Sequence, residues 1–152
     1  MSSSTSDFSE VDDLYQEIIL DHYRNPRNQE PLVEADIQVE GINPFCGDEV
    51  HIFIKLGVGS VSTVSFKGTG CSISQASASM LTDAIKGKTL EEAWALYSSF
   101  RDMMYGKNLD ERQMENLGQA EALSGVKKFP IRIKCALLAW SALGDAIKDH
   151  LG

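Results

Sequence analysis

The residues whose types suit metal or sulfur chemistry are three cysteines and one aspartate. The cysteines are Cys46, Cys71 and Cys135, and Asp48 follows the first of them by two positions. Three thiolates and one carboxylate can complete a tetrahedral zinc site or hold an iron–sulfur cluster. Each cysteine lies at an expected turn or helix start, so we predict that these four residues form the functional site.

The first cysteine lies in a turn before an expected strand. Pro44 stiffens the approach to Cys46, and Gly47 permits a tight reversal of the backbone. A turn of this kind can direct the side chains of Cys46 and Asp48 at one metal ion. Proline, glycine and aspartate are also ordinary turn residues, so the less favoured alternative is an ordinary turn with an incidental cysteine.

The second cysteine lies between a glycine-rich strand exit and an expected helix. Gly68 and Gly70 let the backbone approach other groups closely. The helix after Cys71 directs its N-terminal amides and positive dipole end towards the sulfur, which favours the thiolate. The alternative for Cys71 is a buried cysteine that only fills a corner between strand and helix.

The third cysteine lies in the first turns of the last expected helix. Arg132 and Lys134 precede Cys135 and favour its thiolate, whereas the apolar stretch over 136–140 fits core packing equally well. The three cysteines are separated by 25 and 64 residues, unlike the close pairs of a zinc finger. Spacing alone therefore identifies no site, and the fold would have to gather these residues.

Composition limits the class of protein and its partners. The chain has 152 residues with a net charge of −8, so we predict no nucleic-acid partner, which would need a basic face. No apolar run approaches the roughly 20 residues of a membrane span. Three cysteines without an export signal favour a reducing, cytoplasmic location. Residues 1–10 are Ser-rich and acidic and predict a flexible tail before one domain over 11–152.

Hydrophobic periodicity predicts an α+β fold in two layers, with a three-stranded antiparallel sheet covered on one face by helices. A helix over 11–24 precedes the strands, and a long helix from Pro130 ends the chain. Ser72 and Thr89, each followed three residues later by Gln or Glu, are the expected N-caps of two further helices. The predicted strands span 36–40, 50–56 and 61–67, and the remaining helices span 72–86, 89–105 and a weaker 110–123 that is broken near Gly118.

Taken together, the three cysteine stretches resemble the U-type iron–sulfur cluster assembly proteins, the IscU/SufU family. The family has an Asn-Pro-x-Cys-Gly-Asp turn, a Gly-x-Gly/Cys-Cys-x-x-Ser helix start and a third cysteine at the head of a C-terminal helix. These motifs match residues 43–48, 68–77 and 132–136, and the resemblance extends over 11–150. It implies that the metal ligands are Cys46, Asp48, Cys71 and Cys135.

Two features resemble the SufU branch of that family. Lys134 stands where the scaffold branch has a histidine, and a long helical segment over 87–128 separates the second and third cysteines. The branch is described as a zinc-dependent sulfurtransferase that takes persulfide sulfur from a SufS-type, pyridoxal-phosphate cysteine desulfurase. The resemblance implies that a desulfurase histidine replaces Cys46 on zinc and that Cys46 accepts the sulfur. Arg132 is predicted to orient the partner.

Two other functions use the same residues. In a scaffold protein, they would bind a [2Fe–2S] cluster and pass it to apo-proteins. In a zinc-stabilised adaptor, zinc would be bound but Cys46 would never hold a persulfide. For the sulfurtransferase, the predicted recipients are downstream iron–sulfur scaffold proteins.

Overall fold

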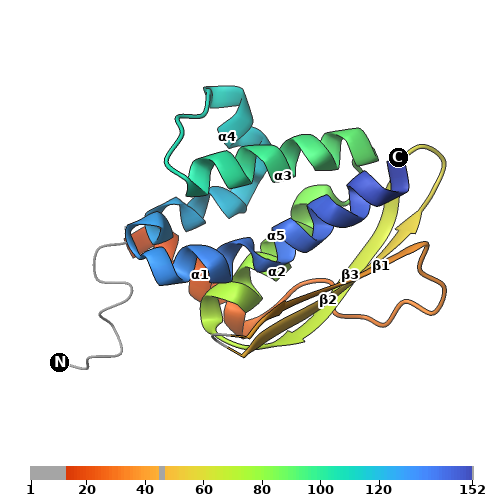
Figure 1. The fold of residues 1–152 in the computed structure, drawn as a ribbon, viewed down its shortest axis with the longest axis horizontal. Helices are drawn as coiled ribbons and strands as arrows, with labels where there is room; N and C mark the ends of the chain where they lie inside the picture. The colour runs from red at the N-terminus through yellow and green to blue at the C-terminus, as the bar shows by residue number, and fades with distance from the viewer. Residues whose placement is uncertain (1–12, 45–46, 152) are drawn as a thin grey trace.

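The computed structural model describes residues 13–44 and 47–151, so Cys46 and the predicted tail over 1–10 lie outside the described residues. The fold is α+β, with a helix before the sheet and a long helix at the end of the chain (Figure 1). The prediction of fold class is confirmed. The elements are α1 (Asp13–Arg24), β1 (Ile37–Asn43), β2 (Asp48–Leu56), β3 (Val61–Thr69), α2 (Ser72–Ile85), α3 (Leu90–Met104), α4 (Glu111–Leu117), the 3₁₀ helix η2 (Gly118–Lys128) and α5 (Pro130–Leu151).

The sheet is an antiparallel meander in the order β1-β2-β3. The alternation in β2 gives one buried face, because Val50, Ile52 and Ile54 are completely buried. β1 and β2 extend further towards their connecting turn than the sequence predicts. Asn43 pairs with Asp48 as the last rung of the ladder. This pairing makes Asp48 the first residue of β2, at the end of the sheet where β1 ends.

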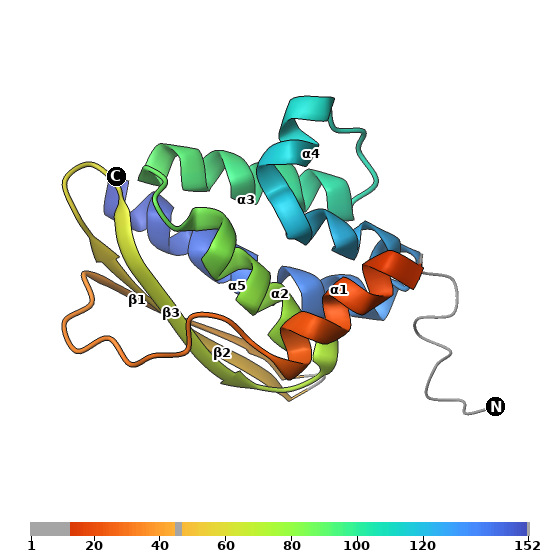
Figure 2. The same cartoon turned by 180° about the vertical axis from the view of Figure 1, so that it is seen from behind.

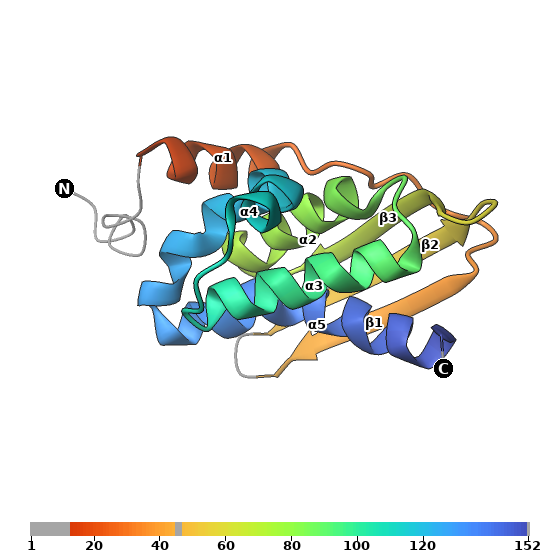
Figure 3. The ribbon, with the colours of Figure 1, turned by 90° about the horizontal axis from the view of Figure 1, so that it is seen from above.

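Helices cover one face of the sheet. α5 contacts β1 and β2, while α2 contacts β3. α1 packs against α2, as the view from behind shows (Figure 2). α3 packs against α5 on the side away from the strands (Figure 3). The ring centroids of Phe100 and Trp140 lie 4.5 Å apart in this contact, with the rings stacked. Within residues 13–44 and 47–151, no helix has the length and apolar content that a membrane crossing needs.

The helix ends confirm one predicted cap and correct another. Thr89 and Glu92 form the expected capping box at the start of α3. The predicted N-cap at Ser72 is wrong, because Ser72 is already helical and Cys71 caps α2 by accepting the N–H of Ser74. The weak helix predicted over 110–123 is α4 followed by η2, and the positive φ of Gly118 separates the two.

A buried histidine joins α1 to two other helices. His22 is completely buried, as expected of a histidine with satisfied hydrogen bonds. Its Nδ1 lies 2.8 Å from Oγ of Ser79, and its Nε2 lies 2.6 Å from Oε1 of Gln119. A neutral ring satisfies both contacts if Nε2–H donates to Gln119 and Nδ1 accepts the Ser79 hydroxyl. Burial lowers the pKa of His22 below its ordinary value of 6.5, although the Gln119 contact opposes this shift.

This lowered pKa predicts a loss of stability in mild acid. Below pH 6.5 the unfolded chain binds a proton at His22 that the native protein does not. The free energy of unfolding therefore decreases as the pH is lowered below 6.5. His22 contributes at most about 1.4 kcal/mol per pH unit. Urea unfolding about one unit above and one unit below pH 6.5 measures this slope. We expect a smaller slope in His22→Gln than in the wild type. Equal slopes in wild type and His22→Gln would contradict the assignment.

Candidate metal centre

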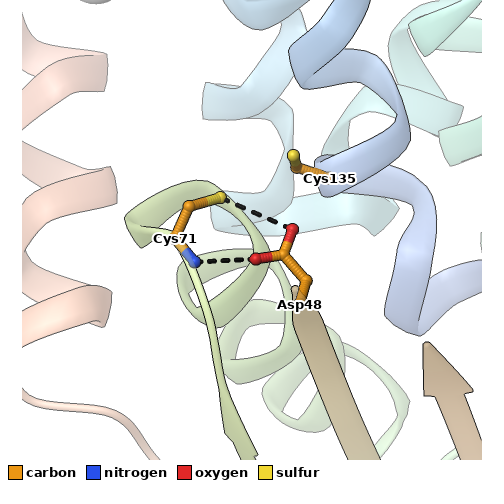
Figure 4. A group of neighbouring side chains, drawn as sticks. All are labelled: Asp48, Cys71 and Cys135. Atoms are coloured by element: carbon orange, nitrogen blue, oxygen red, sulfur yellow. Dashed lines mark hydrogen bonds between the residues drawn. The ribbon is translucent and has the colours of Figure 1, made fainter. Parts of the chain in front are cut away.

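Three of the four predicted ligands meet at one end of the sheet. Asp48, Cys71 and Cys135 each offer one ligand atom, and these atoms lie within 4.8 Å of one another (Figure 4). The three residues come from the first position of β2, the N-cap of α2 and the second turn of α5. The fold therefore gathers side chains that are far apart in the sequence. The placement of Cys46, the fourth predicted ligand, lies outside the described residues.

Asp48 is held by the backbone of Cys71. Its carboxylate is completely buried, and Oδ1 accepts the N–H of Cys71 at 2.8 Å. Oδ2 lies 3.8 Å from Sγ of Cys71, so this oxygen faces the sulfur atoms (Figure 4). Gly70 makes the arrangement possible: its φ is +141°, and a Cβ atom there would lie 2.9 Å from the carboxyl carbon of Asp48. Only glycine avoids both the overlap and the backbone strain.

Cys71 receives direct support from the first turn of α2. Its Sγ accepts the N–H of Ser74 at 3.4 Å. The Cys71 carbonyl accepts the Ser74 hydroxyl at 3.1 Å, which fixes the same turn. As the N-cap, this sulfur lies at the positive end of the α2 dipole. Cys71 is half-buried, so its sulfur is not sealed inside the core.

Cys135 is both a core residue and a member of the site. Its side chain is completely buried among the apolar residues of α5, and its Sγ lies 3.8 Å from the carbonyl oxygen of Ile131. Its Sγ lies within 4.8 Å of the ligand atoms of Asp48 and Cys71, and the three side chains are drawn together in Figure 4. Burial in the core, one of the two alternatives for Cys135, therefore does not remove its sulfur from the candidate site.

The donor set suits a tetrahedral zinc ion, and the spacing between Oδ2 of Asp48 and Sγ of Cys71 agrees with its geometry. Zinc–sulfur bonds of about 2.3 Å and zinc–oxygen bonds of about 2.0–2.2 Å place neighbouring ligand atoms roughly 3.5–3.8 Å apart. The observed 3.8 Å between Oδ2 of Asp48 and Sγ of Cys71 agrees with this value. A buried carboxylate beside two thiols also needs a compensating positive charge, which a cation supplies. Asp48, Cys71 and Cys135 therefore constitute a possible metal site.

Arg132, the predicted partner-orienting residue, does not belong to this group of ligands. It lies half-buried in the first turn of α5, where its N–H donates to the carbonyl of Phe129. Lys134, which replaces the histidine of the scaffold branch, is exposed. It lines a hollow of about 280 Å³ with Ile42, Pro44, Tyr105 and residues further along α5.

One supporting residue escaped the sequence analysis. The hydroxyl of Ser77 donates to the carbonyl oxygen of Ala136 at 2.6 Å, next to Cys135. The signal in the sequence is a serine between two apolar residues, Ala76 and Ala78, in α2.

Comparisons with known proteins identify the family of the chain. The model of the NifU-like N terminal domain matches residues 14–136. The zinc-dependent sulfurtransferase SufU of Bacillus subtilis is 49% identical over 142 residues, which cover 93% of this chain and 95% of the relative. The iron–sulfur cluster assembly scaffold protein IscU of Streptococcus pyogenes is 44% identical, with 92% of this chain and 86% of the relative covered.

A solved structure also matches the fold. It is assigned to the iron–sulfur cluster assembly scaffolds of the SUF system and comes from Fervidobacterium islandicum AW-1. The TM-score is 0.80 at 32% identity, and the match covers 95% of this chain and 99% of that one. The chain therefore belongs to the NifU-like N-terminal domain family, the U-type proteins of iron–sulfur cluster assembly.

Proposed function

We propose that the chain is a zinc-dependent sulfurtransferase, which accepts persulfide sulfur from a SufS-type cysteine desulfurase for iron–sulfur cluster assembly. The main support is the convergence of Asp48, Cys71 and Cys135, whose atoms fit a zinc ion. The identity of 49% to a protein named zinc-dependent sulfurtransferase SufU favours the same function. The reaction suits a reducing compartment such as the cytoplasm, where free thiols persist.

Each ligand has a distinct role in this proposal. A bound Zn²⁺ would be held by Cys71, Cys135 and Asp48, with Cys46 as the fourth ligand, and would favour the deprotonated thiols. The backbone N–H of Cys71 donates a hydrogen bond to the Asp48 carboxylate. Cys135, on α5, is buried in the hydrophobic core. These three residues keep the site assembled when Cys46 leaves it to react.

The transfer step is a thiol–persulfide exchange. The Cys46 thiolate attacks the outer sulfur of the desulfurase persulfide, and a new S–S bond forms. The S–S bond of the desulfurase breaks, and its cysteine leaves as a thiolate. No external oxidant or reductant is required, because the outer sulfur moves with its oxidation state unchanged. We propose that a desulfurase histidine takes the place of Cys46 during this step and that Arg132 orients the partner.

A scaffold for a [2Fe–2S] cluster is the second candidate. The relatives from Streptococcus pyogenes and Thermotoga maritima, at 44% and 38% identity, are both named iron–sulfur cluster assembly scaffold proteins. Three cysteines and an aspartate can also hold such a cluster. In that role the protein would deliver an assembled cluster, whereas the sulfurtransferase delivers only sulfur.

Metal analysis combined with mass spectrometry tests the proposal. Protein purified anaerobically without added iron should contain about one zinc per chain and show no visible absorption band. Incubation with cysteine and a SufS-type desulfurase should then add one sulfur atom, located on the peptide that contains Cys46. Stoichiometric iron and sulfide with a visible band would instead favour the scaffold. Folded protein that binds neither metal would overturn both candidates.

A further inference from the structure

We propose that Ser77 is a positioning residue that fixes the spacing between the two metal ligands Cys71 and Cys135. This inference rests on the metal site of the proposed function and assigns a role to a residue outside the ligand set. Its basis is the hydrogen bond of 2.6 Å from the Ser77 hydroxyl to the carbonyl oxygen of Ala136.

The bond joins the two helices that supply the sulfur ligands. Ser77 lies on α2, whose N-cap is Cys71, and Ala136 directly follows Cys135 on α5. Both ends are completely buried, so water does not compete for either group. The contact therefore fixes both the distance between α5 and α2 and their relative position along the helix axes. It does so close to the sulfur atoms of Cys71 and Cys135.

The local preferences of a helix do not account for this serine. In a helix interior, serine is less favourable than alanine, and its hydroxyl commonly bonds a carbonyl of its own helix. Here the hydroxyl crosses to another helix. The Ala136 carbonyl is already an acceptor within α5 by the regular helical pattern, so the Ser77 contact is an addition to that pattern.

The residues next to Ser77 and Ala136 on both helices include small, buried alanines. Ala76, Ala78, Ala136 and Ala139 are all buried, and small side chains let the two helix backbones approach closely. Without the hydroxyl, these methyl groups still pack and α5 keeps its own hydrogen bonds. The main loss is then the directional constraint on the segment that contains Cys135, rather than the helix pairing itself.

Ser79 provides a matched control on the same helix. It is also completely buried, but its hydroxyl contacts His22 and the N–H of Arg27, and neither belongs to α5. Ser79→Ala should therefore weaken the fold at least as much as Ser77→Ala without moving Cys135. A comparison of the two variants separates positioning of the site from general stability.

The test is a cobalt(II) titration followed by competition with zinc and a chelating dye, alongside urea unfolding of each variant. We expect Ser77→Ala to weaken metal binding about tenfold, the lower end of the effect of lost outer contacts in metal sites, and to alter the thiolate-to-cobalt absorption. Ser79→Ala should lose stability but keep the wild-type affinity and spectrum.

The outcomes distinguish this inference from the proposed function. Wild-type affinity and spectrum in Ser77→Ala, or the same weakening in Ser79→Ala, would overturn the role of Ser77 and leave the sulfurtransferase unaffected. A wild-type protein that binds neither cobalt nor zinc would overturn the metal site and the positioning role together.

Discussion

Replacement of Cys46 by alanine is expected to abolish sulfur acceptance from a cysteine desulfurase and to leave the chain folded. The thiolate at position 46 is the proposed nucleophile, and alanine offers no atom that can form the S–S bond. Asp48, Cys71 and Cys135 keep three ligand atoms within 4.8 Å of one another, so the variant should still bind zinc, with lower affinity. Mass spectrometry after incubation with cysteine and the desulfurase measures the transferred sulfur.

Cys71→Ala is the informative comparison for that experiment. It removes a ligand and also the sulfur that caps α2, so we expect weaker zinc binding and lower stability than in Cys46→Ala. Cys46 remains in this variant, and some sulfur should still be transferred if Cys46 is the acceptor. Sulfur that reaches Cys46→Ala at the wild-type rate would show that another residue accepts it. The zinc-stabilised adaptor would be favoured if neither variant nor wild type accepts sulfur.

Sequence patterns were sufficient for the elements but not for the geometry of the site. The alternation of Val50, Ile52 and Ile54 predicts a strand with one buried face, and the structure confirms it. The ladder continues to Asn43 and Asp48, although neither residue has a strong strand propensity. The position of Asp48 at the start of β2 is thus a property of the pairing between strands, which local propensity does not reveal.

Tertiary contacts explain the details that the sequence missed. Capping rules favour hydroxyl and carboxyl side chains, so they select Ser72 and overlook the sulfur of Cys71. The rules for buried cysteine treat packing and chemistry as alternatives, whereas Cys135 is buried and also faces Asp48. The hydrogen bond from Ser77 joins two segments whose contact no periodicity reveals. The family resemblance implies four ligands, and three of them, Asp48, Cys71 and Cys135, lie together because α2 and α5 pack on the sheet.

Gly70→Ala is expected to have the largest effect of any change that removes no ligand atom. A Cβ at this position overlaps the Asp48 carboxylate and lies 3.0 Å from the Asp48 Cα, so the side chain and the start of β2 must shift. That shift breaks the bond between Oδ1 and the Cys71 N–H, which aligns two of the ligands. We expect zinc affinity to fall about a hundredfold, the upper end for lost outer contacts in metal sites.

The loss of stability in Gly70→Ala has two components that a matched glycine can separate. A residue with Cβ at positive φ costs about 1–2 kcal/mol, and a broken buried hydrogen bond costs about 1–3 kcal/mol. Gly59, in the loop between β2 and β3, has a φ of +78° but no atom within 4 Å of a Cβ. Gly59→Ala should therefore show the backbone cost alone, with zinc affinity unchanged. Urea unfolding and zinc competition measure both effects, and wild-type zinc affinity in Gly70→Ala would mean that Asp48 does not need its contact with Cys71 to bind the metal.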